Sequence, residues 1–124
     1  MAAHTPEDVH PTFAKMFSAG DLEGVMALYE PGAQLIPQPG ASPVSGAAIR
    51  EALQGFLALQ PSISIQTTGV VKTQDVALLR SKWTLSGQGA DGRPVEMSHR
   101  SVEVVRRQAD GTWRFLIDDP FGGE

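Results

Sequence analysis

Apolar and polar residues alternate through the second half of the chain, and this period of two predicts four long β-strands. The predicted strands cover residues 63–72, 76–89, 95–107 and 112–119. Asp91-Gly92 and Asp110-Gly111 lie between runs and are typical of tight hairpin turns. Gly69 inside the first run predicts a bulge, which lets a sheet curve. Together the runs predict an antiparallel meander with one buried face.

In the first half of the chain, apolar residues recur at helical spacing instead. Tyr29, the only tyrosine, lies on the apolar stripe of the second predicted helix, so its buried hydroxyl needs a partner. Helices followed by a strand meander form an α+β arrangement, in which a curved sheet wraps the helices and leaves a cone-shaped cavity. The predicted elements are a helix from Thr5 to Ala19, a short helix from Asp21 up to Pro31-Gly32, a strand at 33–36 and a helix from Ser45 to Leu59.

The length of 124 residues suits one domain, expected over 1–124. The net charge is −4, and Arg106-Arg107 is the one local basic cluster, so no nucleic-acid partner is expected. No apolar stretch reaches the roughly 20 residues of a membrane span, and no membrane partner is expected. The N-terminus lacks the features of a signal peptide, which makes a cytoplasmic location the expectation.

No cofactor and no metal are expected from the sequence. The chain has no cysteine, which excludes disulfides and thiolate ligands. The three histidines, His4, His10 and His99, lack metal-ligand spacing. Residues 87–92 match the glycine pattern of dinucleotide sites, but another alternating strand follows them instead of the helix that this motif needs. These glycines are better explained as a hairpin loop.

Charged residues on the apolar faces provide the candidate chemistry. If Val102 and Val104 point into the core, Arg100 points inward with them. By the same alternation Asp119 follows Ile117 inward. A buried charge needs a partner, so Arg100 and Asp119 are predicted to form a catalytic polar pair on a pocket floor. A structural ion pair, or exposure of both after a one-residue shift in register, remains an alternative.

His99 competes with Arg100, because neighbours on a strand face opposite ways. A bulge near Ser98 would turn His99 inward and offer an imidazole as general base. Asp118 is expected to face outward with Arg114. Packing in the core is the alternative for Trp83 and for Phe17, and it is the favoured interpretation for Tyr29. The residues expected to bind a ligand are Phe17, Tyr29, Gln38, Trp83 and Ser98.

Three segments make the chain resemble the NTF2-like superfamily, and specifically its SnoaL-like and ketosteroid-isomerase-like members. They are residues 17–29 (FSAGDLEGVMALY), 45–53 (SGAAIREAL) and 111–119 (GTWRFLIDD). The resemblance extends from about Glu7 to Phe121 and implies an NTF2-like cone. It implies less about function, because the fold hosts isomerases, cyclases, hydrolases, dehydratases and binding domains.

The site residues of the best-known members are only partly present. Ketosteroid isomerases use a carboxylate base near the first strand, and residues 33–39 contain no acid. Epoxide-hydrolase-like sites use an Asp–Arg–Asp set, and the position expected for the remaining acid is Val102. A SnoaL-like enzyme needs an acid/base carboxylate, for which Asp119 is the candidate.

Two functions follow as hypotheses. The first is a SnoaL-like enzyme with isomerase, cyclase or hydrolase-type acid–base chemistry on a small, mostly apolar molecule. The second is a non-catalytic module for ligand binding or dimerisation. The resemblance also implies a homodimer formed through the outer face of the sheet.

Overall fold

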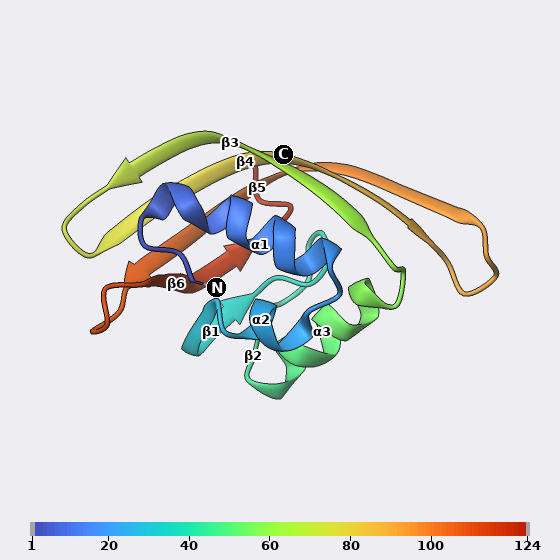
Figure 1. Ribbon diagram of the computed structural model, residues 1–124, viewed down its shortest axis with the longest axis horizontal. Helices are drawn as coiled ribbons and strands as arrows, with labels where there is room; N and C mark the ends of the chain where they lie inside the picture. Colours follow the sequence, from blue (N-terminus) through green and yellow to red (C-terminus); the bar gives the residue numbers. More distant parts are fainter. Residues whose placement is uncertain (1, 124) are drawn as a thin grey trace.

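The computed structural model describes residues 2–123, so residues 1 and 124 of the expected domain lie outside the described residues. Three helices and a short 3-10 turn accompany a six-stranded sheet (Figure 1). The elements are η1 (Pro6–Asp8), α1 (Val9–Ser18), α2 (Leu22–Met26), β1 (Tyr29–Leu35), β2 (Val44–Ser45), α3 (Ala47–Leu57), β3 (Ser62–Lys72), β4 (Val76–Gln88), β5 (Pro94–Arg107) and β6 (Trp113–Asp119).

The sheet runs in the order β2-β1-β6-β5-β4-β3, and every neighbouring pair is antiparallel except β1 and β6. Figure 1 shows β3, β4 and β5 arching over α1, with α2 and α3 on the same side of the sheet. This arrangement confirms the predicted α+β fold, in which helices pack in the concave face of a curved and mainly antiparallel sheet.

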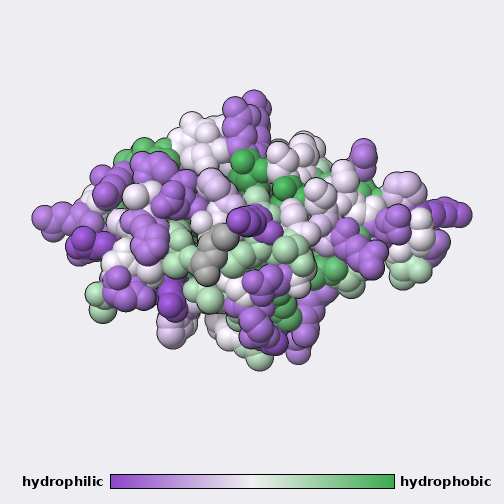
Figure 2. Space-filling view, viewed as in Figure 1, coloured by the Kyte–Doolittle hydropathy of each residue, from purple (hydrophilic) through white to green (hydrophobic). Residues whose placement is uncertain are grey.

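The core lies between the helices and the inner face of the sheet. Val9, Met16 and Phe17 form the buried stripe of α1, and Leu79 and Leu85 face them from β4. Both expected hairpin turns form, and the register of β3 against β4 shifts next to Gly69, as the glycine predicted. Hydrophilic side chains cover most of the surface seen in Figure 2, with hydrophobic ones in small groups.

Two helix boundaries differ from the prediction. Helix α2 ends at Met26, and Tyr29 begins β1, where it pairs with Phe115 of β6. A strand can accept the proline two residues later more easily than a helix, because proline lacks the amide donor that a helix interior uses. Helix α3 starts at Ala47 after Gly46, whose φ of 60° lies in the left-handed region. Ser45 therefore does not cap it.

The inner face of β5 is the opposite of the predicted one. Ser101, Glu103 and Val105 are buried, whereas Val102 and Val104 are half-buried on the outer face. No bulge is needed for this, because β5 pairs with β4 without interruption. The prediction was wrong because the outer face also carries apolar residues, so the valines did not mark the core.

A bulge in β6 reverses the second predicted face. Phe115 pairs with Val105 and Ile117 pairs with Val104, which leaves Leu116 as an extra residue. After this extra residue Ile117 is exposed and Asp118 is buried. The strand therefore delivers Asp118 to the core in place of its neighbour.

Candidate functional site

A small cavity lies inside the cone, between α1, α3 and the inner face of the sheet. Its volume is about 60 Å³, room for a few water molecules or one small group. Aromatic rings make up much of its wall, from Phe13, Phe17, Phe56, Trp83 and Phe115. The polar side chains that reach it are His10, Tyr29, Ser81, Ser101, Glu103 and Asp118.

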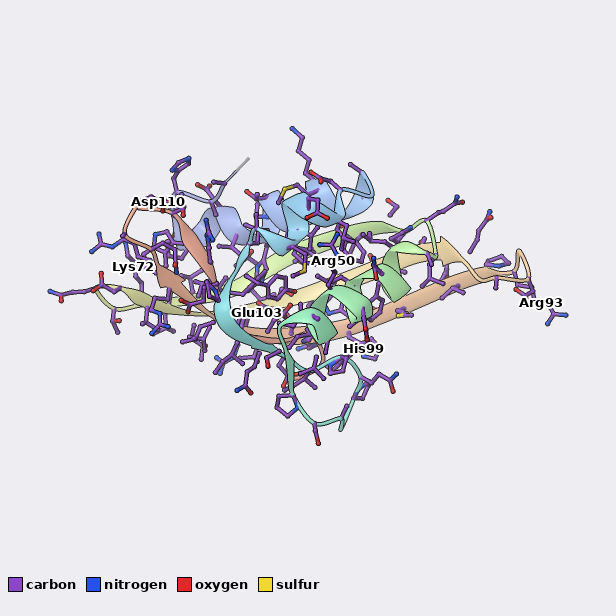
Figure 3. The ribbon with its side chains drawn as sticks, turned by 90° about the horizontal axis from the view of Figure 1, so that it is seen from below. Arg50, Lys72, Arg93, His99, Glu103 and Asp110 are labelled. Carbon is purple, nitrogen blue, oxygen red and sulfur yellow. The ribbon has the colours of Figure 1, made fainter. Side chains whose placement is uncertain are left out.

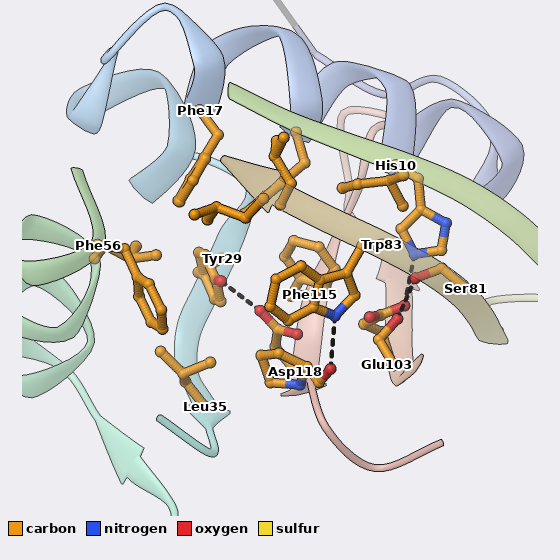
Figure 4. Close-up of a pocket in the computed structure, with 17 residues that line it drawn as sticks. His10, Phe17, Tyr29, Leu35, Phe56, Ser81, Trp83, Glu103, Phe115 and Asp118 are labelled. Atoms are coloured by element: carbon orange, nitrogen blue, oxygen red, sulfur yellow. Dashed lines mark hydrogen bonds and ion pairs between the residues drawn. The ribbon is translucent and has the colours of Figure 1, made fainter. Parts of the chain in front are cut away.

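Tyr29 and Asp118 form the first polar pair of the cavity. The Tyr29 hydroxyl donates to Oδ2 of Asp118 at 2.5 Å, and Figure 4 shows the two side chains pointing toward each other. Tyr29 is 6% exposed and Asp118 5%. No other hydrogen bond to the Asp118 side chain occurs among residues 2–123, and none of their fully buried side-chain polar atoms lacks a partner. Oδ1 of Asp118 therefore faces open space.

His10, Glu103 and Thr67 form the second polar group. Nε2 of His10 lies 2.6 Å from Oε1 of Glu103, and Nδ1 lies 2.7 Å from the Thr67 hydroxyl. His10 and Glu103 are 3% and 4% exposed. Because an ionised carboxylate only accepts hydrogen bonds, Nε2 carries the proton that joins the pair. The histidine thus holds the Glu103 carboxylate in place from one side.

Two further contacts complete the polar lining. The hydroxyls of Ser81 and Ser101, partners on β4 and β5, bond to each other. The indole Nε1–H of Trp83 donates to the carbonyl oxygen of Pro120 at 2.7 Å. These groups satisfy one another, so the surface that a ligand would meet is mostly apolar.

The two carboxyl groups sit in different electrostatic surroundings. Burial, most of all, and the charges of Glu103 and Asp119 raise the pKa of Asp118 from its ordinary 3.8, while the Tyr29 hydrogen bond lowers it; together these influences bring the pKa to about 8. At neutral pH Asp118 is mostly protonated. Burial and the nearby Asp118 raise the pKa of Tyr29 well above 10, so the phenol stays neutral. Asp118 can act as a neutral hydrogen-bond donor beside a Glu103 that has its own histidine partner.

The predicted site residues fall into three groups. Phe17, Tyr29 and Trp83 line the cavity. Gln38 lies on a shallow groove outside it, with His99. Their contact with a ligand stays a prediction. His99 faces the inner side without the bulge near Ser98 that this alternative required: its ring centroid lies 5.4 Å from that of Trp83, its cross-strand partner.

The predicted catalytic pair does not reach the cavity. Arg100 and Ser98 are exposed on the outer face of β5, because Ser101 and Glu103 take the inner positions. Asp119 pairs with the outward-facing Val102 and lies at the rim, on the groove beside His99. The inward-pointing prediction for Arg100, Ser98 and Asp119 was therefore wrong, and so was the outward one for Asp118.

Sequence reasoning missed the roles of His10 and Glu103. His10 carried a usable signal, because it lies one residue after Val9 and three before Phe13, on the buried stripe of α1. Glu103 carried none, because it stands between two valines that pointed to the opposite face. Figure 3 places Glu103 in the interior, away from Arg93 and Asp110 at the hairpin tips.

Within residues 2–123 no group of three or more His, Asp or Glu side chains is placed to hold a metal ion. None of the helices in that part of the chain is long and apolar enough to cross a membrane.

Comparison with known proteins identifies a family for this chain. The sequence model of the SnoaL-like domain family matches residues 11–115. No curated protein matches the chain.

Solved structures share the fold at low sequence identity. A conserved protein from Planctomyces limnophilus superposes with a TM-score of 0.84 at 15% identity, over 93% of this chain and 91% of that one. A ketosteroid isomerase-like protein from Erwinia carotovora atroseptica gives 0.73 at 21%, over 91% and 89%. An NTF2-like protein with a cystatin-like fold from Novosphingobium aromaticivorans gives 0.74 at 17%, over 90% and 75%.

Proposed function

The chain belongs to the SnoaL-like domain family, and from this premise we propose that it is an enzyme that moves a proton next to a carbonyl group of a small, mostly apolar molecule. One observation carries the proposal. Two carboxyl groups, Asp118 and Glu103, are buried in one apolar cavity with different partners, so that one is protonated and the other can serve as a base. Pairs of titratable groups in contrasting surroundings are the usual basis of acid–base catalysis.

Asp118 is the hydrogen-bond donor in this mechanism. Tyr29 donates to Oδ2, so the proton of the neutral acid sits on Oδ1, the oxygen that faces the cavity. From there it can donate to a ligand carbonyl oxygen and stabilise the negative charge that develops on it. A preorganised donor in a water-poor site contributes about 10²- to 10³-fold to such a rate.

Glu103 is the base. Its Oε1 is bonded to His10, and the second oxygen can accept a proton from the carbon next to the carbonyl. The electron pair of that C–H bond moves toward the carbonyl oxygen as the proton reaches Glu103. Return of the proton to another carbon completes an isomerisation. In a dehydration Glu103 instead passes the proton to a hydroxyl on the neighbouring carbon, which leaves as water while the electron pair forms the new double bond. Thr67 and His10 keep the carboxylate oriented.

The lining also indicates the kind of ligand. No lysine or arginine is among the described residues that line the cavity, whereas two acids are. An anionic ligand would therefore meet uncompensated negative charge, and an uncharged molecule with a single oxygen acceptor fits better. Aromatic walls favour a ring or another flat apolar body.

A non-catalytic binding module is the second candidate, and the mutual satisfaction of the polar groups favours it. In that case the cavity holds an apolar ligand and the acids only maintain the structure. The two candidates differ in whether the protein accelerates proton exchange on a bound carbonyl compound.

Isomerisation of cyclohex-3-enone to cyclohex-2-enone, followed by absorbance, tests the proposal without knowledge of the natural substrate. The reaction takes a proton from C2 and returns it at C4. We expect acceleration over buffer, and a loss of about 10²-fold or more in Glu103→Gln and in Asp118→Asn. The rate should fall as the pH passes about 8, because Asp118 then loses its donor proton.

Asp119→Asn is the matched control, because it makes the same change one residue away on the rim. It should keep the wild-type rate. Binding of the enone without acceleration, or equal rates in all variants, would favour the binding module instead.

A further inference from the structure

The two acids of the candidate site are neighbours on the sheet. Glu103 of β5 and Asp118 of β6 are register partners, and both are buried on the inner face. The Cβ atoms of such partners lie about 5 Å apart. Two negative charges this close in a buried site repel each other strongly, so the pair holds one proton near neutral pH. The surroundings of the pair determine which acid keeps that proton.

The hydrogen bonds around Glu103 form a chain of three groups. The Thr67 hydroxyl lies 2.7 Å from Nδ1 of His10, and Nε2 of His10 lies 2.6 Å from Oε1 of Glu103 (Figure 4). In a neutral imidazole one nitrogen donates a hydrogen bond and the other accepts one. With a neutral ring the chain can therefore run in only two directions.

The two directions correspond to different charges on the acids. When Thr67 donates to Nδ1, Nε2 carries the ring proton and donates to an ionised Glu103. When Glu103 is protonated and donates to Nε2, the proton on Nδ1 is donated to Thr67 instead. The distances between the heavy atoms fit both directions. The direction of the chain therefore follows the acid on which the negative charge is more stable.

The contacts of the two acids favour the first direction. An ionised Asp118 would have Tyr29 as its one side-chain donor within residues 2–123, and burial, above all, raises the pKa of this acid. A charge on Glu103 instead meets the imidazole N–H, and the bond from Thr67 to the other nitrogen strengthens that N–H as a donor. An imidazole, unlike a phenol, can also accept a second proton and become positive.

We propose that His10 is the positioning residue that places the negative charge on Glu103 and leaves the proton on Asp118. Thr67 supports it by holding the ring from the opposite side. His10 thereby determines which acid is the base and which is the donor, and its loss exchanges the two roles. The inference rests on the proposed function for the meaning of these roles, but the position of the charge can be measured without turnover.

Carbon-13 NMR of the carboxyl carbons follows each acid separately. Asp118→Asn and Glu103→Gln identify the two signals by their loss. At pH 7 the wild type should show a protonated Asp118 and an ionised Glu103. His10→Phe keeps a ring but has no N–H, and in this variant we expect the reverse pattern. The charge then lies on Asp118, which retains its hydrogen bond from Tyr29.

Two further variants control this measurement. His10→Gln should keep the wild-type pattern, because its side-chain amide can still donate to Glu103. His4→Phe makes the same change as His10→Phe at an exposed position, and it should also keep that pattern. A protonated Asp118 beside an ionised Glu103 in His10→Phe would overturn the proposal, because the charge would then not depend on the imidazole.

Nitrogen-15 NMR of the wild type tests the direction of the chain even if His10→Phe does not fold. At pH 7 the His10 ring should carry a proton on Nε2. A ring protonated on Nδ1 alone would overturn the proposal, because Glu103 would then be the group that donates to His10.

The same spectrum tests the other end of the chain. Thr67→Val keeps the shape of the side chain without its hydroxyl, whereas Thr67→Ser keeps the hydroxyl. The Nδ1 signal of His10 should move in Thr67→Val toward that of a nitrogen without a hydrogen bond, and it should stay near the wild-type position in Thr67→Ser. The same signal in both variants would contradict the part assigned to Thr67.

These measurements separate the inference from the proposed function. If the charges lie as proposed and cyclohex-3-enone is not isomerised, the role of His10 holds and the proposed function fails. If the enone is isomerised and His10→Phe keeps the wild-type charges, the proposed function holds and the role of His10 fails.

Discussion

The proposed chemistry depends on the contrast between two buried acids. Glu103 has a histidine as its hydrogen-bond partner, whereas among residues 2–123 the Asp118 side chain has only a phenol. A phenol can donate a hydrogen bond but brings no positive charge, so it stabilises ionised Asp118 less than burial destabilises it. Asp118 therefore avoids a buried, unpaired charge by staying protonated.

The raised pKa of Asp118 predicts a pH-dependent stability. The unfolded carboxyl releases its proton near pH 4, whereas the folded one keeps it up to about pH 8. The contribution of Asp118 to the free energy of unfolding is therefore fully present below pH 4 and is lost as the pH rises through about 8. Asp118→Asn is the reference, because its neutral amide does not titrate and can still accept a hydrogen bond from Tyr29. Between pH 6 and 8 the free energy of unfolding of the wild type should fall by about 2 kcal/mol relative to that of this variant. Urea unfolding at several pH values measures this difference.

Asp119→Asn serves as the control for the same titration, because its carboxyl lies at the rim. Its curve should stay close to that of the wild type, with a slightly smaller loss of stability, because the Asp119 charge is the smallest of the influences that raise the pKa of Asp118. If the difference between the wild type and Asp118→Asn stays constant over the whole pH window, Asp118 is ionised in the folded protein and the donor role fails.

At the scale of elements, the sequence predicted where the strands lie much better than which way they face. Turn residues such as Asp91-Gly92 determine where a strand ends, and these signals are local. The face is a tertiary property. On β5 both Val102 and Val105 are apolar, and only the covering helices decide which of the two rows is the inner one.

The candidate site could not be predicted for the same reason. The bulge at Leu116 moves Asp118 to the inner face, and nothing in the letters of β6 distinguishes Leu116 from a regular strand residue. A single extra residue exchanges every later side chain between faces. The predicted fold did not depend on this bulge, but the predicted acid did, so Asp119 was chosen in place of Asp118.

The next prediction concerns the close contact between β4 and the turn after α3. A Cβ at Gly87 of β4 would lie 2.7 Å from the carbonyl oxygen of Leu59, which itself accepts from the amide of Gln88. Because backbone blocks the site, Gly87→Ala should lower the free energy of unfolding by about 1–3 kcal/mol. At Gly69 of β3 the nearest atom is 3.8 Å away.

Gly69→Ala is the matched control, since it is also a strand glycine outside the left-handed region. It should leave stability unchanged or raise it by up to about 1 kcal/mol through the unfolded state. Chemical denaturation of both variants decides the matter. Equal effects at the two positions would mean that the Leu59 carbonyl yields at little cost.

At the scale of the whole molecule, the outer face of the sheet carries an apolar row across four strands. Val71 lies opposite Leu78, Leu78 opposite Val104, and Val104 opposite Ile117. Val71 is 63% exposed and Ile117 43%. Leu78 and Val104 between them are half-buried. An apolar row of this kind on an outer face favours an interaction surface. This outer row is also what misled the assignment of the inner face of β5.

A second copy of the chain suits the outer row, because a row of aliphatic side chains can pack on its own symmetry mate about a twofold axis. We therefore expect a homodimer. Ile117→Lys should shift it to a monomer without loss of the fold, since a lysine within the apolar contact would be buried without a partner. Light scattering after size exclusion, over a wide range of protein concentration, measures the mass, and circular dichroism checks the fold. Thr84→Lys adds the same charge to the same face outside the row, and it should remain dimeric. The prediction fails if the wild type is monomeric at every concentration. It also fails if Thr84→Lys dissociates as readily as Ile117→Lys.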